Sequence, residues 1–84
     1  MTKERPTVSE YCREVELRHA LGELTTEQTI VLTVTYKFAA QGKTVNVRYL
    51  MQMTNLNWVK INNLLNGLVQ RGALKKIDKY FYTI

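Results

Sequence analysis

The chain has 84 residues, enough for one domain and too few for two. Its net charge of +5 and its hydrophobic content of 45% are ordinary for a soluble globular protein. The single cysteine, Cys12, has no partner for an intramolecular disulfide, so nothing indicates a secreted disulfide scaffold. The first residues are too polar for a signal peptide, and no apolar run approaches the roughly 20 residues of a membrane span. We therefore expect a cytoplasmic protein with no membrane segment.

Positive charge is concentrated after residue 24. Residues 1–24 carry four basic and five acidic side chains, whereas residues 25–84 carry eight basic and two acidic ones. A basic body of this kind favours a polyanion as partner. Many proteins that bind no nucleic acid carry a similar excess, so charge alone leaves the partner open.

The first predicted helix spans residues 7–22 and follows a polar segment, residues 1–6, that we expect to be flexible. Thr7 suits the N-cap position, and Glu10, three residues later, completes a capping box. Gly22 is suited to end the helix.

Two apolar lines run along this helix. The first contains Val8, Tyr11, Cys12 and Val15, and the second contains Leu17, Leu21 and Leu24. Either both lines cover the core of the domain, or one packs on the core and the other on a partner chain. The residues that we predict as a dimer interface are Val8, Tyr11, Cys12 and Val15.

Residues 25–42 contain conflicting signals. The run TIVLTVTYKF, from Thr29 to Phe38, alternates in a strand-like way and is rich in β-branched side chains. However, the sequence Thr-Thr-Glu-Gln at residues 25–28 is typical of a helix start. The segment also continues for about 17 residues to a glycine, which is too long for an ordinary strand. We predict a helix, with one side formed by Ile30, Val31, Val34 and Phe38.

Residues 44–72 predict two helices joined by a tight turn. A short extended piece at residues 43–45 comes first and can add one strand to a small sheet. Asn46 caps the helix over residues 47–53, and Asn57 caps the helix over residues 58–71. Asn55, in the turn, tolerates the left-handed backbone that such a turn commonly demands. The predicted inward residues are Leu50, Met51, Ile61, Leu64, Leu65 and Leu68.

Two further features complete the chain. Gly67, inside the second helix of the pair, costs about 1 kcal/mol relative to alanine, and we interpret it as a site of close packing. Residues 73–77 and 80–84 are β-prone runs around Asp78-Lys79 and predict a hairpin.

From Leu24 onward, the chain resembles the winged helix-turn-helix family and, within it, the MarR-like regulators. LTTEQTIVLTVTYKF is similar to the family's opening helix, which commonly begins LT-x-E-Q-x-x-V-L. LMQMTNLN is similar to the helix-turn junction, with Asn55 where a glycine is usual and Asn57 where a serine usually caps. INNLLNGLVQRGALKK is similar to the exit of the recognition helix into the wing, and KYFYTI to the returning wing strand.

The resemblance implies a mainly α fold with a small β-hairpin wing, an α+β class. A winged helix-turn-helix body over residues 25–84 would follow an extra N-terminal helix, within one domain over residues 1–84. The sequence departs from the family in two respects, because its wing tip at Asp78-Lys79 is short and it shows no counterpart of the family's C-terminal dimerisation helix. The N-terminal helix would then have to supply any dimer interface.

The resemblance also implies that the helix over residues 57–71 enters the major groove of double-stranded DNA. Asparagine can pair bidentately with adenine, and lysine can contact guanine or a phosphate. An asparagine-rich face can equally be plain solvated surface, and Trp58 can either pack on the preceding helix or meet a partner. The predicted DNA-binding residues of this helix are Asn57, Trp58, Lys60, Asn62, Asn63 and Asn66.

Other residues are predicted to contact phosphates, which positions a protein on DNA without reading its sequence. Any one of these lysines can also be a merely solvated charge. The predicted phosphate-binding residues are Lys43 and Arg48, near the first helix of the pair, and Lys75, Lys76, Lys79 and Tyr80, in the wing.

We therefore predict a small sequence-specific DNA-binding transcriptional regulator that acts as a homodimer. The alternative is a protein-interaction module on the same fold, such as a transcription-machinery adaptor or an antagonist of another regulator. Trp58, Val59 and the short wing favour it. We predict no enzyme activity, cofactor or metal site. The single His, Cys and Asp are far apart in sequence, and no glycine-rich phosphate loop is present.

Overall fold

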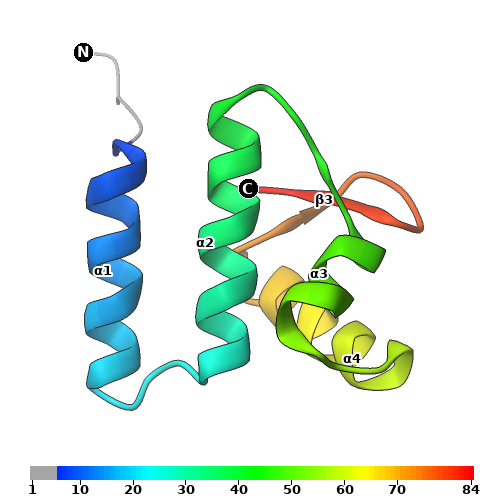
Figure 1. Ribbon diagram of the computed structural model, residues 1–84, viewed down its shortest axis with the longest axis horizontal. Helices are drawn as coiled ribbons and strands as arrows, with labels where there is room; N and C mark the ends of the chain where they lie inside the picture. The colour runs from blue at the N-terminus through cyan, green and yellow to red at the C-terminus, as the bar shows by residue number, and fades with distance from the viewer. Residues whose placement is uncertain (1–5) are drawn as a thin grey trace.

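Four helices and a small antiparallel sheet make up residues 6–84, the part of the chain that the computed structural model describes (Figure 1). The helices are α1 (Val8–Ala20), α2 (Thr26–Ala40), α3 (Val47–Thr54) and α4 (Trp58–Gln70). The strands are β1 (Val45–Asn46), β2 (Lys75–Lys76) and β3 (Phe81–Thr83). The predicted class, mainly α with a small amount of β, is confirmed. The prediction of a flexible N-terminal tail falls, apart from Pro6, outside the described residues.

The helices α1 and α2 each begin with a capping box. The Thr7 hydroxyl accepts a hydrogen bond from the Glu10 N–H at 3.1 Å, and the Glu10 carboxylate accepts one from the Thr7 N–H at 3.3 Å. Thr25 and Gln28 form the same reciprocal pair at 3.2 and 2.9 Å, so Thr25 is the cap of α2. Each box satisfies N–H groups that a helix start otherwise leaves without partners.

The strand-like alternation in α2 did not prevent a helix. Thr29, Thr33 and Thr35 donate their hydroxyls to carbonyls one turn earlier, as from Thr35 Oγ1 to the Val31 oxygen at 2.7 Å. Of the predicted apolar side, Val31 is buried in the core and Val34 and Phe38 are partly buried against it. Leu32, Thr35 and Tyr36, which lie outside that side, are buried as well. The reason is that α2 packs on α1 on one side and on α3, β1 and β3 on the other, so its buried side is broad.

An aromatic stack joins α1 to α2. The rings of Tyr11 and Tyr36 lie 3.8 Å apart and within 8° of parallel, and the Tyr36 hydroxyl donates to the Pro6 carbonyl. Val15 is buried beside them at 5% exposure. Tyr11 and Val15 thus make contacts within the chain, and Val8, Tyr11 and Cys12 are each only partly buried, so a dimer interface on this line stays a prediction. Of the second apolar line, Leu17 and Leu21 are exposed.

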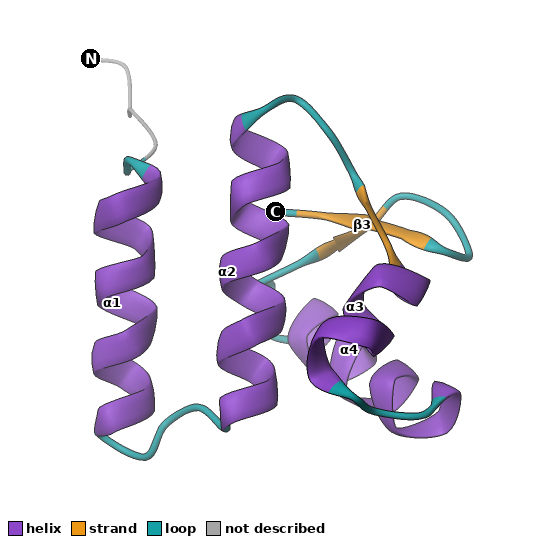
Figure 2. Ribbon diagram, in the orientation of Figure 1, coloured by secondary structure: helices purple, strands orange, loops and turns teal. Residues whose placement is uncertain are grey.

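The sheet has the strand order β1-β3-β2, and both pairings are antiparallel (Figure 2). The central strand, β3, contributes the fully buried Tyr82, which lies opposite Val45 on one side and Lys76 on the other. The hairpin strands are shorter than predicted. The Ala73 and Leu74 N–H groups donate to the Leu68 carbonyl and close the end of α4, so β2 begins only at Lys75.

The core lies between α2, the pair α3 and α4, and β3. Because each of these elements contributes fully or nearly fully buried side chains to one cluster, α4 is held in place from several directions. The most buried members of the cluster are Val31, Val45, Leu50, Ile61, Leu65, Leu68 and Tyr82.

Gly67 does not serve close packing, contrary to our interpretation of the sequence. A Cβ atom placed on it would meet no atom within 4 Å. Gly72, just past the end of α4, has a φ of +79°, a left-handed conformation that glycine adopts without strain.

Gly67→Ala should therefore raise the free energy of unfolding by about 0.5–1 kcal/mol, because alanine loses less backbone entropy in a helix and meets open space. Gly72→Ala is the matched control and should lower it by about 1–2 kcal/mol. Urea denaturation followed by circular dichroism measures both. A destabilised Gly67→Ala protein would mean that a neighbour does contact this position.

The Tyr11 hydroxyl should make stability fall at high pH. Burial, with a further contribution from Tyr36, raises the pKa of Tyr11 to about 12, whereas an unfolded tyrosine has a pKa near 10. Below pH 10 both states keep the proton, and above it the unfolded state loses its proton first. The free energy of unfolding should therefore decrease as the pH rises from 10 towards 12.

Urea denaturation at a series of pH values tests this. Tyr11→Phe should reduce the decrease without abolishing it, because burial also raises the pKa of Tyr82. The exposed Tyr49 supplies a control, Tyr49→Phe, which should leave the decrease unchanged. If the stability of Tyr11→Phe decreased between pH 10 and 12 as much as that of the wild-type protein, the decrease would not come from the Tyr11 hydroxyl.

Candidate nucleic-acid interface

Three asparagines set the geometry of α3 and α4. Asn46 caps α3, since its Oδ1 accepts from the Arg48 N–H at 2.8 Å, and Asn57 caps α4, since its Oδ1 accepts from the Lys60 N–H at 2.9 Å. Asn55 has a φ of 59°, the left-handed conformation predicted for the turn. Because the amide oxygen of Asn57 is used for capping, pairing it with a base would cost the helix its cap.

The two sides of α4 differ sharply. Ile61, Leu65 and Leu68 are buried as predicted, whereas Leu64 is only partly buried. A helix turns 100° per residue, so the outermost ridge runs through Val59, Asn63, Asn66 and Gln70. Lys60 is also exposed, and Asn62 is half-buried. The accessible residues of α4 are therefore two apolar side chains, Trp58 and Val59, in its first turn and mainly amides after it.

Trp58, whose role the sequence left open, both packs and stays accessible. Its ring centroid lies 6.0 Å from that of Tyr80 at an angle of 51°, and the residue is 42% exposed. Tyr80 belongs to the hairpin loop, residues 77–80. The Asp78 carboxylate shapes this loop by accepting from the Tyr80 and Phe81 N–H groups at 2.9 and 3.1 Å.

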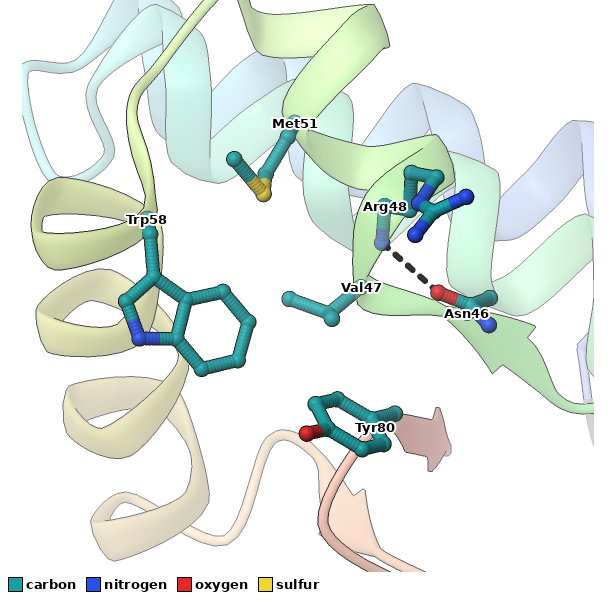
Figure 3. Close-up of a pocket in the computed structure, with 6 residues that line it drawn as sticks. All are labelled: Asn46, Val47, Arg48, Met51, Trp58 and Tyr80. Carbon is teal, nitrogen blue, oxygen red and sulfur yellow. Dashed lines mark hydrogen bonds between the residues drawn. The ribbon is translucent and has the colours of Figure 1, made fainter.

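Trp58 and Tyr80 border a hollow of about 540 Å³, here called the aromatic notch (Figure 3). It forms where the first turns of α3 and α4 meet the hairpin loop. Val47 and Met51 contribute apolar side chains to it, and Asn46 and Arg48 contribute polar ones. The residues that line it are Asn46, Val47, Arg48, Met51, Trp58 and Tyr80.

The aromatic notch brings together three residues that were predicted for two different roles in DNA binding. Trp58 was assigned to the base-reading face, and Arg48 and Tyr80 to phosphate contacts. Lys79 lies close by, with its Nζ 5.5 Å from the centroid of the Tyr80 ring. Sequence reasoning missed the hollow itself and assigned Met51 only to the core. The only signal in the sequence was that Trp58 begins a predicted helix near Lys60 and that Tyr80 follows a predicted turn beside Lys79.

The remaining predicted cations do not form one cluster. Lys43 precedes β1 and the exposed Lys75 and Lys76 form β2, so they lie at opposite edges of the sheet, with β3 between them. Within residues 6–84, the only ion pair joins Arg18 to Glu14 on α1, at 3.3 Å. The basic side chains of residues 25–84 therefore form no ion pair within residues 6–84.

Comparison of the chain with protein families, with curated proteins and with solved structures found no match. In the part of the chain that the structure describes, none of the helices combines the length and apolarity needed to cross a bilayer. Nor do three or more His, Cys, Asp or Glu side chains of that part gather where they could hold a metal ion. A function is therefore inferred from the residues and their geometry alone.

Proposed function

We propose that the chain is a winged helix-turn-helix domain that binds double-stranded DNA and regulates transcription. The observation that carries this proposal is the division of α4 into a buried apolar side and an accessible side rich in amides. A helix is about 10–12 Å wide and fits the major groove, which is about 12 Å wide. Amides exposed on such a helix can pair with the edges of adenine bases.

The elements around α4 support the same proposal. α3 precedes it through a tight turn, and the hairpin of β2 and β3 follows it. Unpaired cations stand on these neighbours, with Arg48 on α3, Lys75 and Lys76 on β2, and Lys79 in the loop. With α4 in the groove, we assign these cations to the flanking phosphates, which hold the protein without reading sequence.

Two substitutions should separate base reading from phosphate binding. Asn63 is exposed on the outermost ridge of α4, so Asn63→Ala should relax specificity at one or two base pairs and cost about 1–3 kcal/mol at the preferred site. Lys76→Ala should weaken binding to all sequences alike and reduce the log–log salt slope by about 0.9. Fluorescence anisotropy on a site selected from a randomised duplex library, titrated with salt, measures both effects.

The matched control is Arg13→Ala, which removes an exposed cation from α1, a helix that does not flank α4. It should leave both the specificity and the salt slope unchanged. If the wild-type protein selects no site and binds duplexes no better than weak non-specific binding at low salt, the proposed function is wrong.

We extend the proposal to a homodimer, because two symmetry-related helices read two half-sites about one helical turn apart. On α1, Tyr11 and Val15 are used within the chain, whereas Leu17 and Leu21 are 59% and 66% exposed. We therefore move the proposed dimer contact from the first apolar line of α1 to these two leucines.

Sedimentation equilibrium tests the dimer. The wild-type protein should sediment as a dimer, and the double variant Leu17→Lys/Leu21→Lys as a monomer, because two charges would replace the apolar contact. Val59→Lys, which alters an equally exposed apolar residue on α4, should stay dimeric. A monomeric wild-type protein at the concentrations that saturate DNA would contradict this part of the proposal.

A protein-interaction module on the same fold is the second candidate, and one observation favours it. The aromatic notch is lined by Trp, Tyr, Met and Arg, the side chains in which protein interfaces are enriched, and the exposed Val59 follows Trp58 directly. Capture of one stoichiometric protein partner that DNA fails to displace would support this candidate over DNA binding.

A further inference from the structure

The aromatic notch combines two partly exposed aromatic residues with two apolar side chains. Trp58 and Tyr80 remain 42% and 45% exposed although their ring centroids are only 6.0 Å apart, and the rings are tilted by 51° and do not stack on each other. Val47 and Met51 point into the same space from α3 (Figure 3). A planar ligand could therefore cover one ring while its edge rests on aliphatic groups.

The surroundings of the aromatic notch are cationic. Arg48 lines it, and the Lys79 ammonium lies 5.5 Å from the centre of the Tyr80 ring. The nearest acidic residue in sequence, Asp78, already has one carboxylate oxygen engaged by two backbone N–H groups. The site therefore suits a ligand with a flat π-surface and a negative charge. Accessible aromatic rings combined with cations are the means by which proteins bind single-stranded nucleic acid.

The size of the hollow points to a ligand larger than one apolar side chain. Its volume of about 540 Å³ falls in the range of roughly 300–1,000 Å³ that is typical of small-molecule sites. A peptide could cover the rings with one residue only if a second, acidic residue met the cations. A nucleotide carries the flat ring and the anionic group in one unit, so it matches the site more economically.

We infer that the aromatic notch binds one unpaired nucleobase of DNA, stacked on Trp58 or Tyr80, with the adjoining phosphates near Arg48 and Lys79. This inference deepens the proposed function and rests on it in taking DNA as the partner. A base in an intact duplex must first be unstacked at a cost of a few kcal/mol, whereas a base in a single-stranded end is already free. The protein should therefore prefer duplexes that have an unpaired base beside the bound site.

The experiment compares three versions of one duplex, namely blunt, extended by short thymidine overhangs, and extended by overhangs of abasic nucleotides. The abasic overhang keeps the phosphates and removes the bases, so it separates stacking from charge. The thymidine overhang should bind about tenfold more tightly than the blunt duplex, since stacking on an aromatic ring favours each bound base. The abasic overhang should bind about as the blunt duplex does, apart from a small electrostatic gain.

Two readouts are available. Anisotropy of labelled DNA gives the affinities, and the fluorescence of Trp58, the only tryptophan of the chain, reports occupation of the aromatic notch directly. Thymidine overhangs should quench this fluorescence saturably, and abasic overhangs should not. In Trp58→Ala and Tyr80→Ala, the ratio of the overhang and blunt affinities should fall towards one, whereas Trp58→Phe and Tyr80→Phe should keep most of it.

The control variant is Ile77→Ala, which alters an exposed side chain of the same loop that does not line the hollow and should keep the full ratio. Circular dichroism verifies that each variant folds. If blunt, thymidine and abasic duplexes bind equally, the inference is wrong and the proposed function stands. If thymidine oligonucleotides quench Trp58 although no duplex binds, the inference holds and the proposed function is wrong.

Two further outcomes would also overturn the inference. The first is the absence of any quenching by thymidine oligonucleotides at low salt. The second is saturable quenching by an acidic peptide with one phenylalanine when no nucleic acid quenches, which would assign the aromatic notch to a protein partner.

Discussion

The burial of one side of α4 is the constraint on which the rest of the structure depends. Ile61, Leu65 and Leu68 belong to the same buried cluster as residues from α2, α3 and β3. A helix anchored on one side by three such residues cannot rotate about its axis without exposing them to water, at a cost of about 1.5–3 kcal/mol for each side chain. The rotation of α4, and hence the identity of its accessible residues, follows from this packing.

Five of the six asparagines in residues 44–72 divide into two groups with different physical roles, and the sixth, Asn62, is half-buried. Asn46, Asn55 and Asn57 serve the backbone, two as caps and one in a left-handed turn. Asn63 and Asn66 are exposed and serve no such purpose. The amide-rich appearance of the segment therefore overstates the number of groups that are free for a partner. The amides that remain accessible to a partner are mainly those of Asn63 and Asn66, and cations lie on the neighbouring elements.

The aromatic notch adds a second kind of surface beside the amide face. Its residues come from the starts of α3 and α4 and from the hairpin loop, which are separated along the chain. Aromatic rings bind flat or apolar groups, whereas amides and lysines bind polar edges and phosphates. The two surfaces adjoin at Trp58, which begins α4 and also lines the aromatic notch. One partner could therefore contact both surfaces at once.

The sequence by itself determined the features that depend on contacts within a few residues. The capping box of α1, the caps of α3 and α4 and the left-handed Asn55 were predictable, because a cap needs only the right side chain at the right spacing. For α2 the sequence predicted an N-terminal cap at Thr25 or Thr26, and the capping box of Thr25 with Gln28 was found only in the structure. The helical state of α2 was also predictable, since its N-terminal cap and its length outweighed a strand-like alternation. The buried ridge of α4 followed from the helical period.

Only the tertiary structure decided which surfaces remained free. The inward side of α2 could not be derived from its own period, because it depends on packing against elements on two sides. Likewise, the stack on Tyr36 partly covers Tyr11, a predicted dimer residue, and the end of α4 shortened β2 by taking the N–H groups of Ala73 and Leu74. The aromatic notch exists only because the fold brings Trp58 to Tyr80, 22 positions later in the sequence. Periodicity and capping rules concern residues a few positions apart, so they cannot predict a contact between residues 22 positions apart in the sequence.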